Sequence, residues 1–161
     1  MDKNLLEDLK LHNRIRFKGG ELWSVHDDCW VDFGGPKEIV VEKIDWTGGE
    51  DITGWVVGEP NHHVYGSDDC FEGIQITPEL LLSKNFVENE HIYPYPCYEY
   101  RNEEHKFLVR YAFCEGSPKT KRKRNFIEID AEQAETNVPC NYYHEFQNAL
   151  KSCEIDEYMD F

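Results

Sequence analysis

The chain has 161 residues, with 17 Lys and Arg against 32 Asp and Glu, so its formal net charge is −15. A chain of this length is long enough for one domain with a real hydrophobic core. Its hydrophobic content of 40% argues against a disordered chain. Generic binding to DNA or to anionic membranes over the whole surface is disfavoured, because phosphates would be repelled.

The composition of the first residues and the spacing of the cysteines indicate the cellular compartment. The opening MDKNLLEDLK is too acidic for a secretory signal, and no apolar run approaches the roughly 20 residues of a membrane span. The six cysteines are widely spaced, without a C-x-x-C pair. We therefore expect a cytoplasmic protein with reduced thiols, no membrane association and no cofactor.

The first half of the chain has the pattern of short strands separated by glycine-rich turns. The predicted strands are Arg14–Phe17, Leu22–Val25, Cys29–Phe33, Glu38–Asp45 and Gly54–Val57. Strands so short and so close in sequence protect their edges most simply by closing on themselves. The pattern therefore predicts a small SH3-like β-barrel part over residues 1–76, in which residues 61–70 form a polar loop between the predicted strands and the helix.

The second half begins with a short helix that is well specified by its ends. Thr77 is expected to cap the helix, Pro78 suits its first position, and Asn85 suits a left-handed residue after its last turn. A strand over Lys106–Cys114, a loop over 115–124 and a strand over Asn125–Ile129 then predict a β-hairpin. A C-terminal helix is expected from Asn141, as its N-cap, to Cys153.

These elements predict an α+β fold in one compact domain, residues 1–161. Its first part is the SH3-like barrel over residues 1–76. Its second part, residues 77–161, consists of a short helix, a β-hairpin and a C-terminal helix.

Three stretches of the sequence carry a resemblance to a family. LKLHNRI at 9–15 resembles L-R-I-G-N-x-V. IQITPELL, which begins at Ile74, and the residues up to Phe86 resemble I-P-L-T-E-E-x-L-x-x-x-G-F, and HEFQNAL at 144–150 resembles H-x-L-Q-N-L. In this order, the stretches resemble small uncharacterised proteins of phages, prophages and mobile elements of gut anaerobic bacteria. His12 and Asn85 stand where the family pattern has glycine. The resemblance implies a genomic setting and a fold, and no reaction.

The acidic residues suggest a function that suits this setting. Nine acids lie between His26 and Glu59, among them Asp27, Asp28 and Asp32. An acidic surface of this kind can occupy the basic groove of another protein, as a DNA mimic does. The favoured interpretation is a non-enzymatic interaction protein that contacts a host protein, for example in defence evasion.

Four tryptophans fall in the predicted barrel, and most of them are expected in its core or at its rim. We also expect one or two of them, together with Tyr65, to line a recognition surface. The tryptophans are Trp23, Trp30, Trp46 and Trp55.

Lys119–Arg124 suggests an alternative function, since it holds five of the 17 basic residues in six positions. Such a run can contact the phosphates of a nucleotide or a nucleic acid, while Tyr95 and Tyr98 stack on bases. It is equally typical of a merely solvated loop, or of one that neutralises the acidic face. The candidate binding residues of this nucleotide-binding or sequestering protein are Lys121, Arg122, Lys123 and Arg124.

A third interpretation, a metal-dependent hydrolase, rests on His62, His63, Asp68 and Asp69. Adjacent histidines on a strand point to opposite faces, however, and a polar loop explains the same composition. For His144, at the start of the last helix, the favoured role is a hydrogen bond that fixes this helix in place.

Overall fold

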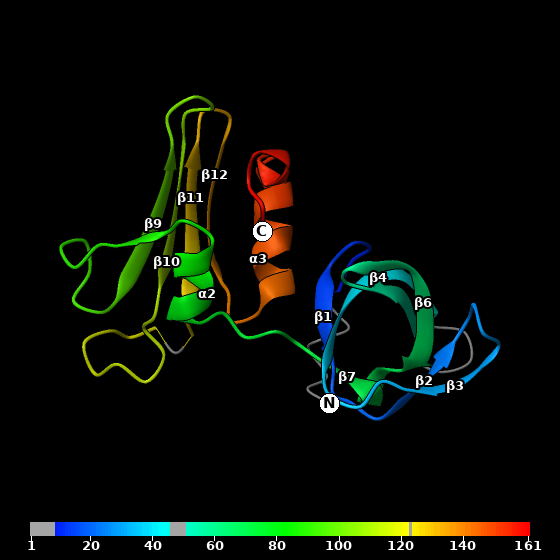
Figure 1. Ribbon diagram of the computed structural model, residues 1–161. Coiled ribbons are helices and arrows are strands. Elements are labelled where there is room, and N and C mark those ends of the chain that lie inside the picture. The colour runs from blue at the N-terminus through cyan, green and yellow to red at the C-terminus, as the bar shows by residue number, and fades with distance from the viewer. Residues whose placement is uncertain (1–8, 46–50, 123) are drawn as a thin grey trace. The chain divides into compact units, whose positions relative to one another are not determined.

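The computed structural model describes residues 9–45, 51–122 and 124–161. The chain divides into two compact units, Met1–Ile74 and Gln75–Phe161. Each unit has its own antiparallel sheet, and the α-helices of the described residues lie in the second unit (Figure 1). This composition is consistent with the predicted α+β class. None of these helices has the length and apolar character that a membrane crossing requires.

The first unit contains a seven-stranded sheet with the order β3-β2-β6-β5-β4-β1-β7. Its elements are β1 Arg14–Phe17, β2 Glu21–Ser24, β3 Cys29–Asp32, β4 Lys37–Asp45, β5 Asp51–Val56, β6 Glu59–Ser67, the 3-10 turn η1 Asp68–Cys70 and β7 Phe71–Glu72. The five predicted strands are therefore present. The sheet is strongly curled (Figure 1), but its described pairings leave β3 and β7 as two edges. Closure into an SH3-like barrel stays a prediction.

Side chains of this sheet alternate between a buried and a solvent-facing side. One face is aliphatic, with two phenylalanines, and is almost completely buried. Its members are Leu9, Ile15, Phe17, Leu22, Ile39, Val41, Ile52, Val56, Val64 and Phe71. At Gly54 the strands approach so closely that a Cβ atom would overlap the carbonyl oxygen of Val40. The opposite, outer face is the one available for contacts.

Strand β6 corrects the expected polar loop around residues 61–70. Val64 and Gly66 are buried, whereas His63, Tyr65 and Ser67 lie on the outer face, so this segment alternates like any half-buried strand. The alternation is hard to recognise in the sequence because one inward position is a glycine. The outward positions are polar or aromatic, which gave the segment the composition of a loop.

The second unit contains a five-stranded sheet with the order β12-β11-β10-β9-β8. Its elements are α2 Pro78–Ser83, β8 Val87–Glu88, β9 Cys97–Asn102, β10 Phe107–Ala112, β11 Phe126–Ala131, β12 Ala134–Pro139, α3 Tyr143–Ser152 and the 3-10 turn η2 Asp156–Tyr158. The predicted hairpin is confirmed, because β10 and β11 pair along their full lengths. β9 and β12 were not predicted.

The ends of α2 are as the sequence predicts. Thr77 Oγ1 accepts a hydrogen bond from the backbone N–H of Leu80 at 3.2 Å, and Pro78 occupies the first turn. Asn85, just beyond the helix, has a φ of 66°, in the left-handed region that asparagine tolerates.

The start of α3 differs from the prediction, since Tyr142 and not Asn141 is the N-cap. The cause is Glu145, whose carboxylate accepts hydrogen bonds from the backbone N–H groups of Asn141, at 2.6 Å, and Tyr142, at 3.1 Å. This carboxylate satisfies amide groups at the helix start, so the asparagine side chain is not needed there.

The core of the second unit is aromatic. Phe146 of α3 stacks on Tyr111 of β10, with ring centroids 6.0 Å apart, and both side chains are fully buried. The Tyr111 hydroxyl donates to the carbonyl oxygen of Cys140 at 2.6 Å. This hydrogen bond ties β10 to the segment that leads into α3, so helix and sheet are fixed to one another by polar and apolar contacts together.

Candidate interaction surface

Three aromatic side chains cross the outer face of the first sheet on adjacent strands. Trp23 of β2 lies directly opposite Trp30 of β3 on one side and Tyr65 of β6 on the other. The two indole rings meet edge to face, with centroids 5.7 Å apart. Trp30 is 61% exposed and Tyr65 40% exposed, whereas Trp23 is half-buried between them. We call Trp23, Trp30 and Tyr65 the aromatic row.

The row is held in place and continues into apolar surface. The Tyr65 hydroxyl donates a hydrogen bond to Asp51 at 2.5 Å, and this bond is the main reason that the pKa of Tyr65 is raised. Val25 follows Trp23 on the same face and is 51% exposed. The row therefore offers a continuous, ordered apolar surface to solvent.

The three acids predicted to bind lie on the hairpin that carries Trp30. Asp27 accepts a hydrogen bond from Ser24 Oγ at 2.7 Å, and Asp32 Oδ1 accepts one from the backbone N–H of Gly34 at 2.7 Å. Asp28 has a φ of 54° in the turn between β2 and β3. All three are exposed, so each combines a local role in the turn with a carboxylate facing solvent.

The two histidines of β6 contact different acids. His62 lies 3.2 Å from Glu59 and 3.7 Å from Asp27, whereas His63 Nδ1 lies 2.8 Å from Glu42. Asp68 and Asp69 belong to the turn η1. In the part of the chain that the structure describes, no three His, Cys, Asp or Glu side chains are grouped as metal ligands would be. The four residues of the hydrolase interpretation are thus not assembled into one site.

The basic run lies in the loop between β10 and β11. The Arg122 guanidinium lies 3.9 Å from the centroid of the Phe126 ring and donates to Asn137 Oδ1 at 2.8 Å. Arg124 donates to Glu145 at 2.9 Å. Lys119 and Lys121 are exposed, and Lys123 lies outside the described residues. Two of the predicted cations are therefore held by partners within the unit.

The tyrosines expected to stack on bases have different surroundings. Tyr98 is only 5% exposed, so the prediction that it stacks on a base is wrong: its ring is taken up by the core. Tyr95 is half-buried and stacks on Tyr93, with centroids 5.2 Å apart and planes 8° from parallel. Both rings pack against Phe126.

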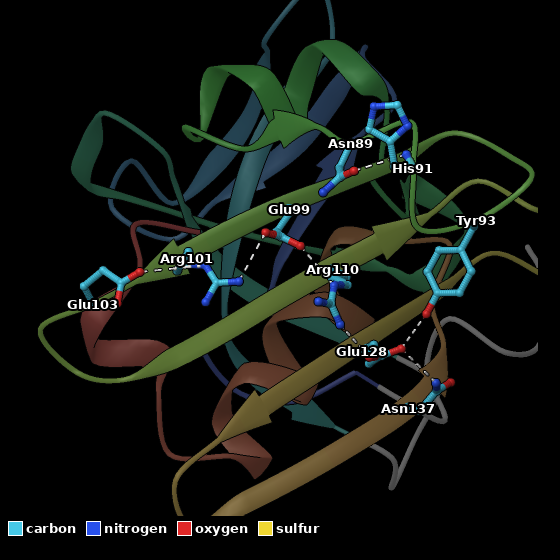
Figure 2. A network of polar contacts seen from close by, with 9 residues as sticks. All are labelled: Asn89, His91, Tyr93, Glu99, Arg101, Glu103, Arg110, Glu128 and Asn137. Atoms are coloured by element: carbon cyan, nitrogen blue, oxygen red, sulfur yellow. Dashed lines mark hydrogen bonds and ion pairs between the residues drawn. The ribbon is translucent and has the colours of Figure 1, made fainter.

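A ladder of charges on the second sheet was missed by sequence reasoning. Figure 2 shows Arg110 between Glu99, at 3.0 Å, and Glu128, at 3.1 Å, with Tyr93 donating to Glu128 at 2.7 Å. The three charged residues lie opposite one another in the register of β9, β10 and β11. Arg110 is shared by the two carboxylates, and Glu99 is also contacted by Arg101 at 3.6 Å. These pairs join the strands, so we interpret the ladder as structural.

Burial raises the pKa of several groups of the second unit. It raises the pKa of the Cys97 thiol to about 11 and that of Cys140 well above its usual range. The pKa of Tyr93 is raised by burial and by its hydrogen bond to Glu128, and that of Tyr111 chiefly by burial. These groups are protonated at neutral pH and are not activated as nucleophiles.

Comparison with models of protein families, with curated proteins and with solved structures found no match to this chain.

Proposed function

We propose that the chain is a non-enzymatic interaction protein that binds a host protein through the aromatic row and the adjoining acids Asp27, Asp28 and Asp32. The observation that carries this proposal is the exposure of Trp30, at 61%, on an edge strand. An indole ring in this position contributes little to the core. It is the type of side chain that dominates the binding energy of protein interfaces.

The surroundings of the row indicate the chemistry of the partner. Carboxylates around an apolar centre favour a basic surface and disfavour an acidic one. Among the described strands, β3 is also an edge of its sheet, and an edge strand can pair with the backbone of an approaching chain. A basic protein surface with an apolar centre is the partner that this side of the first unit fits best.

The proposal includes the biological setting that the resemblance implies. A cytoplasmic protein of phage or mobile-element origin would meet basic nucleic-acid-binding proteins of its host, and the net charge of −15 suits contact with them. The proposed scaffold for the surface is an SH3-like arrangement of residues 1–76.

Affinity capture from a lysate of host cells tests the proposal with a matched pair of variants. Trp30→Ser removes the exposed ring of the row, whereas Val87→Ser removes an apolar side chain that is 67% exposed in the second unit. We expect the same partner with the unmodified protein and with Val87→Ser, and at least tenfold less with Trp30→Ser. Equal capture by all three proteins, or no capture by any, would contradict the proposal.

The contribution of the acids is tested by the triple variant Asp27→Asn, Asp28→Asn, Asp32→Asn. Asparagine keeps the size of each side chain and tolerates the left-handed backbone at position 28. We expect weaker capture and a smaller effect of salt on it, since the attraction between charges is lost. The triple variant Glu103→Gln, Glu104→Gln, Glu132→Gln, on exposed acids of the second unit, is the control.

A further inference from the structure

We propose a second, independent binding site in the second unit, where the Arg122 guanidinium and the neighbouring Lys119 and Lys121 bind an unpaired nucleobase together with its phosphate. Single-stranded nucleic acid and free nucleotides both carry this chemistry. The proposal does not rest on the proposed function of the first unit.

The stacking surface is formed by Arg122. Its guanidinium lies over the Phe126 ring at 3.9 Å, and Phe126 itself is buried, so one face of the guanidinium plane is covered by the protein. Nη1 donates to Asn137 Oδ1 at 2.8 Å, which fixes the plane. Arg122 is exposed, which leaves its other face to solvent. A fixed guanidinium plane is a surface on which bases stack.

The ring beneath the guanidinium is itself held firmly. Tyr93 and Tyr95 stack on one another and meet Phe126 edge to face, with centroids 5.6 and 6.4 Å from it. The Tyr93 hydroxyl donates to Glu128, which also lies 3.5 Å from Asn137 Nδ2 (Figure 2). The support of Arg122 is thus part of the sheet and needs no ligand to order it.

Cations for the phosphate lie in the same loop. Lys119 and Lys121 are exposed. Two side chains form hydrogen bonds with the backbone of this loop. Ser117 Oγ accepts from the Lys119 N–H at 3.3 Å, and Thr120 Oγ1 accepts from the Arg122 N–H at 3.1 Å. Arg124 is paired with Glu145.

The acids near the site do not cancel this charge. Glu128 is paired with Arg110, and Glu115 is an exposed residue at the start of the loop. At physiological ionic strength, exposed charges more than about 8 Å away are largely screened, so the distant acids of the chain oppose a ligand that stays close to the loop less than they oppose a long nucleic acid. The site therefore suits a short unpaired stretch. A duplex, whose bases are already stacked and paired, lacks the free base that Arg122 would contact.

The experiment uses the full chain and a fluorescently labelled single strand of about ten nucleotides, within the usual site size of such proteins. Fluorescence anisotropy is measured over a range of salt concentrations, with the same sequence as a duplex and with unlabelled ATP as competitor. We expect the duplex to bind at least tenfold more weakly than the single strand. With two phosphate contacts, the logarithm of the affinity falls with that of salt with a slope of about −1.4. If ATP at millimolar concentration displaces the labelled strand, a free nucleotide is an adequate ligand. If it does not, the ligand is a single strand.

Two variants separate stacking from charge. Arg122→Lys keeps the positive charge and removes the plane, and we expect at least a tenfold loss of single-strand affinity. Arg101→Lys is the matched control, because Arg101 is an exposed arginine of the same sheet that contacts Glu99 and Glu103. A circular dichroism spectrum verifies that each variant is folded. The proposal is overturned if neither the single strand nor ATP binds, if the duplex binds equally well, or if Arg122→Lys behaves like Arg101→Lys.

Discussion

The two units differ in the exposure of their large aromatic side chains. In the first unit the buried face is mainly aliphatic, and Trp23, Trp30 and Tyr65 lie outside. In the second unit the rings are inside, with Tyr111 and Phe146 fully buried between β10 and α3. Aromatic side chains stabilise a fold when they are buried. The rings of the second unit therefore contribute to stability, whereas the exposed rings of the aromatic row contribute little to it and are the ones we propose for binding.

The largest effect is expected from the aromatic core of the second unit. Phe146→Ala removes a fully buried ring and is expected to lower the free energy of unfolding by about 3–5 kcal/mol. All four tryptophans precede residue 75, so tryptophan emission reports on the first unit, and far-UV circular dichroism reports on both. In urea, we expect Phe146→Ala to lower the midpoint of the circular dichroism transition and to leave the midpoint of the tryptophan transition unchanged. Equal movement of both would show that the units unfold together.

A smaller effect is expected in the first unit from Gly54→Ala. The added methyl group would overlap the carbonyl oxygen of Val40 and touch the Ile39 side chain, so β4 and β5 must shift apart. Overpacking of this kind costs about 1–3 kcal/mol. The midpoint of the tryptophan transition in urea measures it. Gly58→Ala, at a turn where a Cβ atom meets open space but φ is 85°, separates backbone strain from overlap.

Alkaline pH is expected to weaken the second unit selectively. The pKa of the Cys97 thiol is about 11 in the folded unit against an ordinary value of 9, so folding favours the protonated form. Its stabilising contribution is complete below about pH 9 and is lost progressively as pH rises through 11. Cys140, Tyr93 and Tyr111 act in the same direction. Urea unfolding at pH 8 and 10 tests this, and a fall confined to the tryptophan transition would contradict it.

The smallest effect on stability is expected for Trp30, the principal residue of the proposed binding surface. Trp30→Ser should change the free energy of unfolding by less than about 0.5 kcal/mol, because the indole ring is largely exposed. The tryptophan transition of the variant, followed through the remaining indoles, measures this change. A loss of several kcal/mol would mean that the ring stabilises the fold and would remove the main support for a binding role.

The sequence predicted those elements whose signals are local. Thr77, Pro78 and Asn85 specify α2 by capping chemistry alone, and pairs of glycines separate β1 from β2 and β3 from β4. β6 and β12 were missed because their stability comes from neighbours. β6 has a glycine at an inward position, and β12 is an exposed edge strand without an apolar stripe. The N-cap of α3 was misassigned because Glu145 replaces the asparagine side chain.

The candidate sites were predictable to a similar extent. The acids of the hairpin and the basic loop can be recognised in the sequence as groups of like charges. The tryptophans can be recognised by their concentration in the first half of the chain. Their arrangement depends on register, which sets Trp23 opposite Trp30 and Tyr65. It also depends on contacts between residues far apart in sequence, such as Arg122 with Asn137. Neither the strand register nor such a long-range contact can be recognised in any single segment of the sequence.

Photocrosslinking in host cells tests the central claim most directly. A benzophenone amino acid replaces Trp30 in one variant and Tyr158, an exposed aromatic residue of the second unit, in another. We predict a covalent adduct with one host protein from position 30 and none from position 158. No adduct from position 30, or the same adducts from both positions, would contradict the assignment of the aromatic row as the interaction surface.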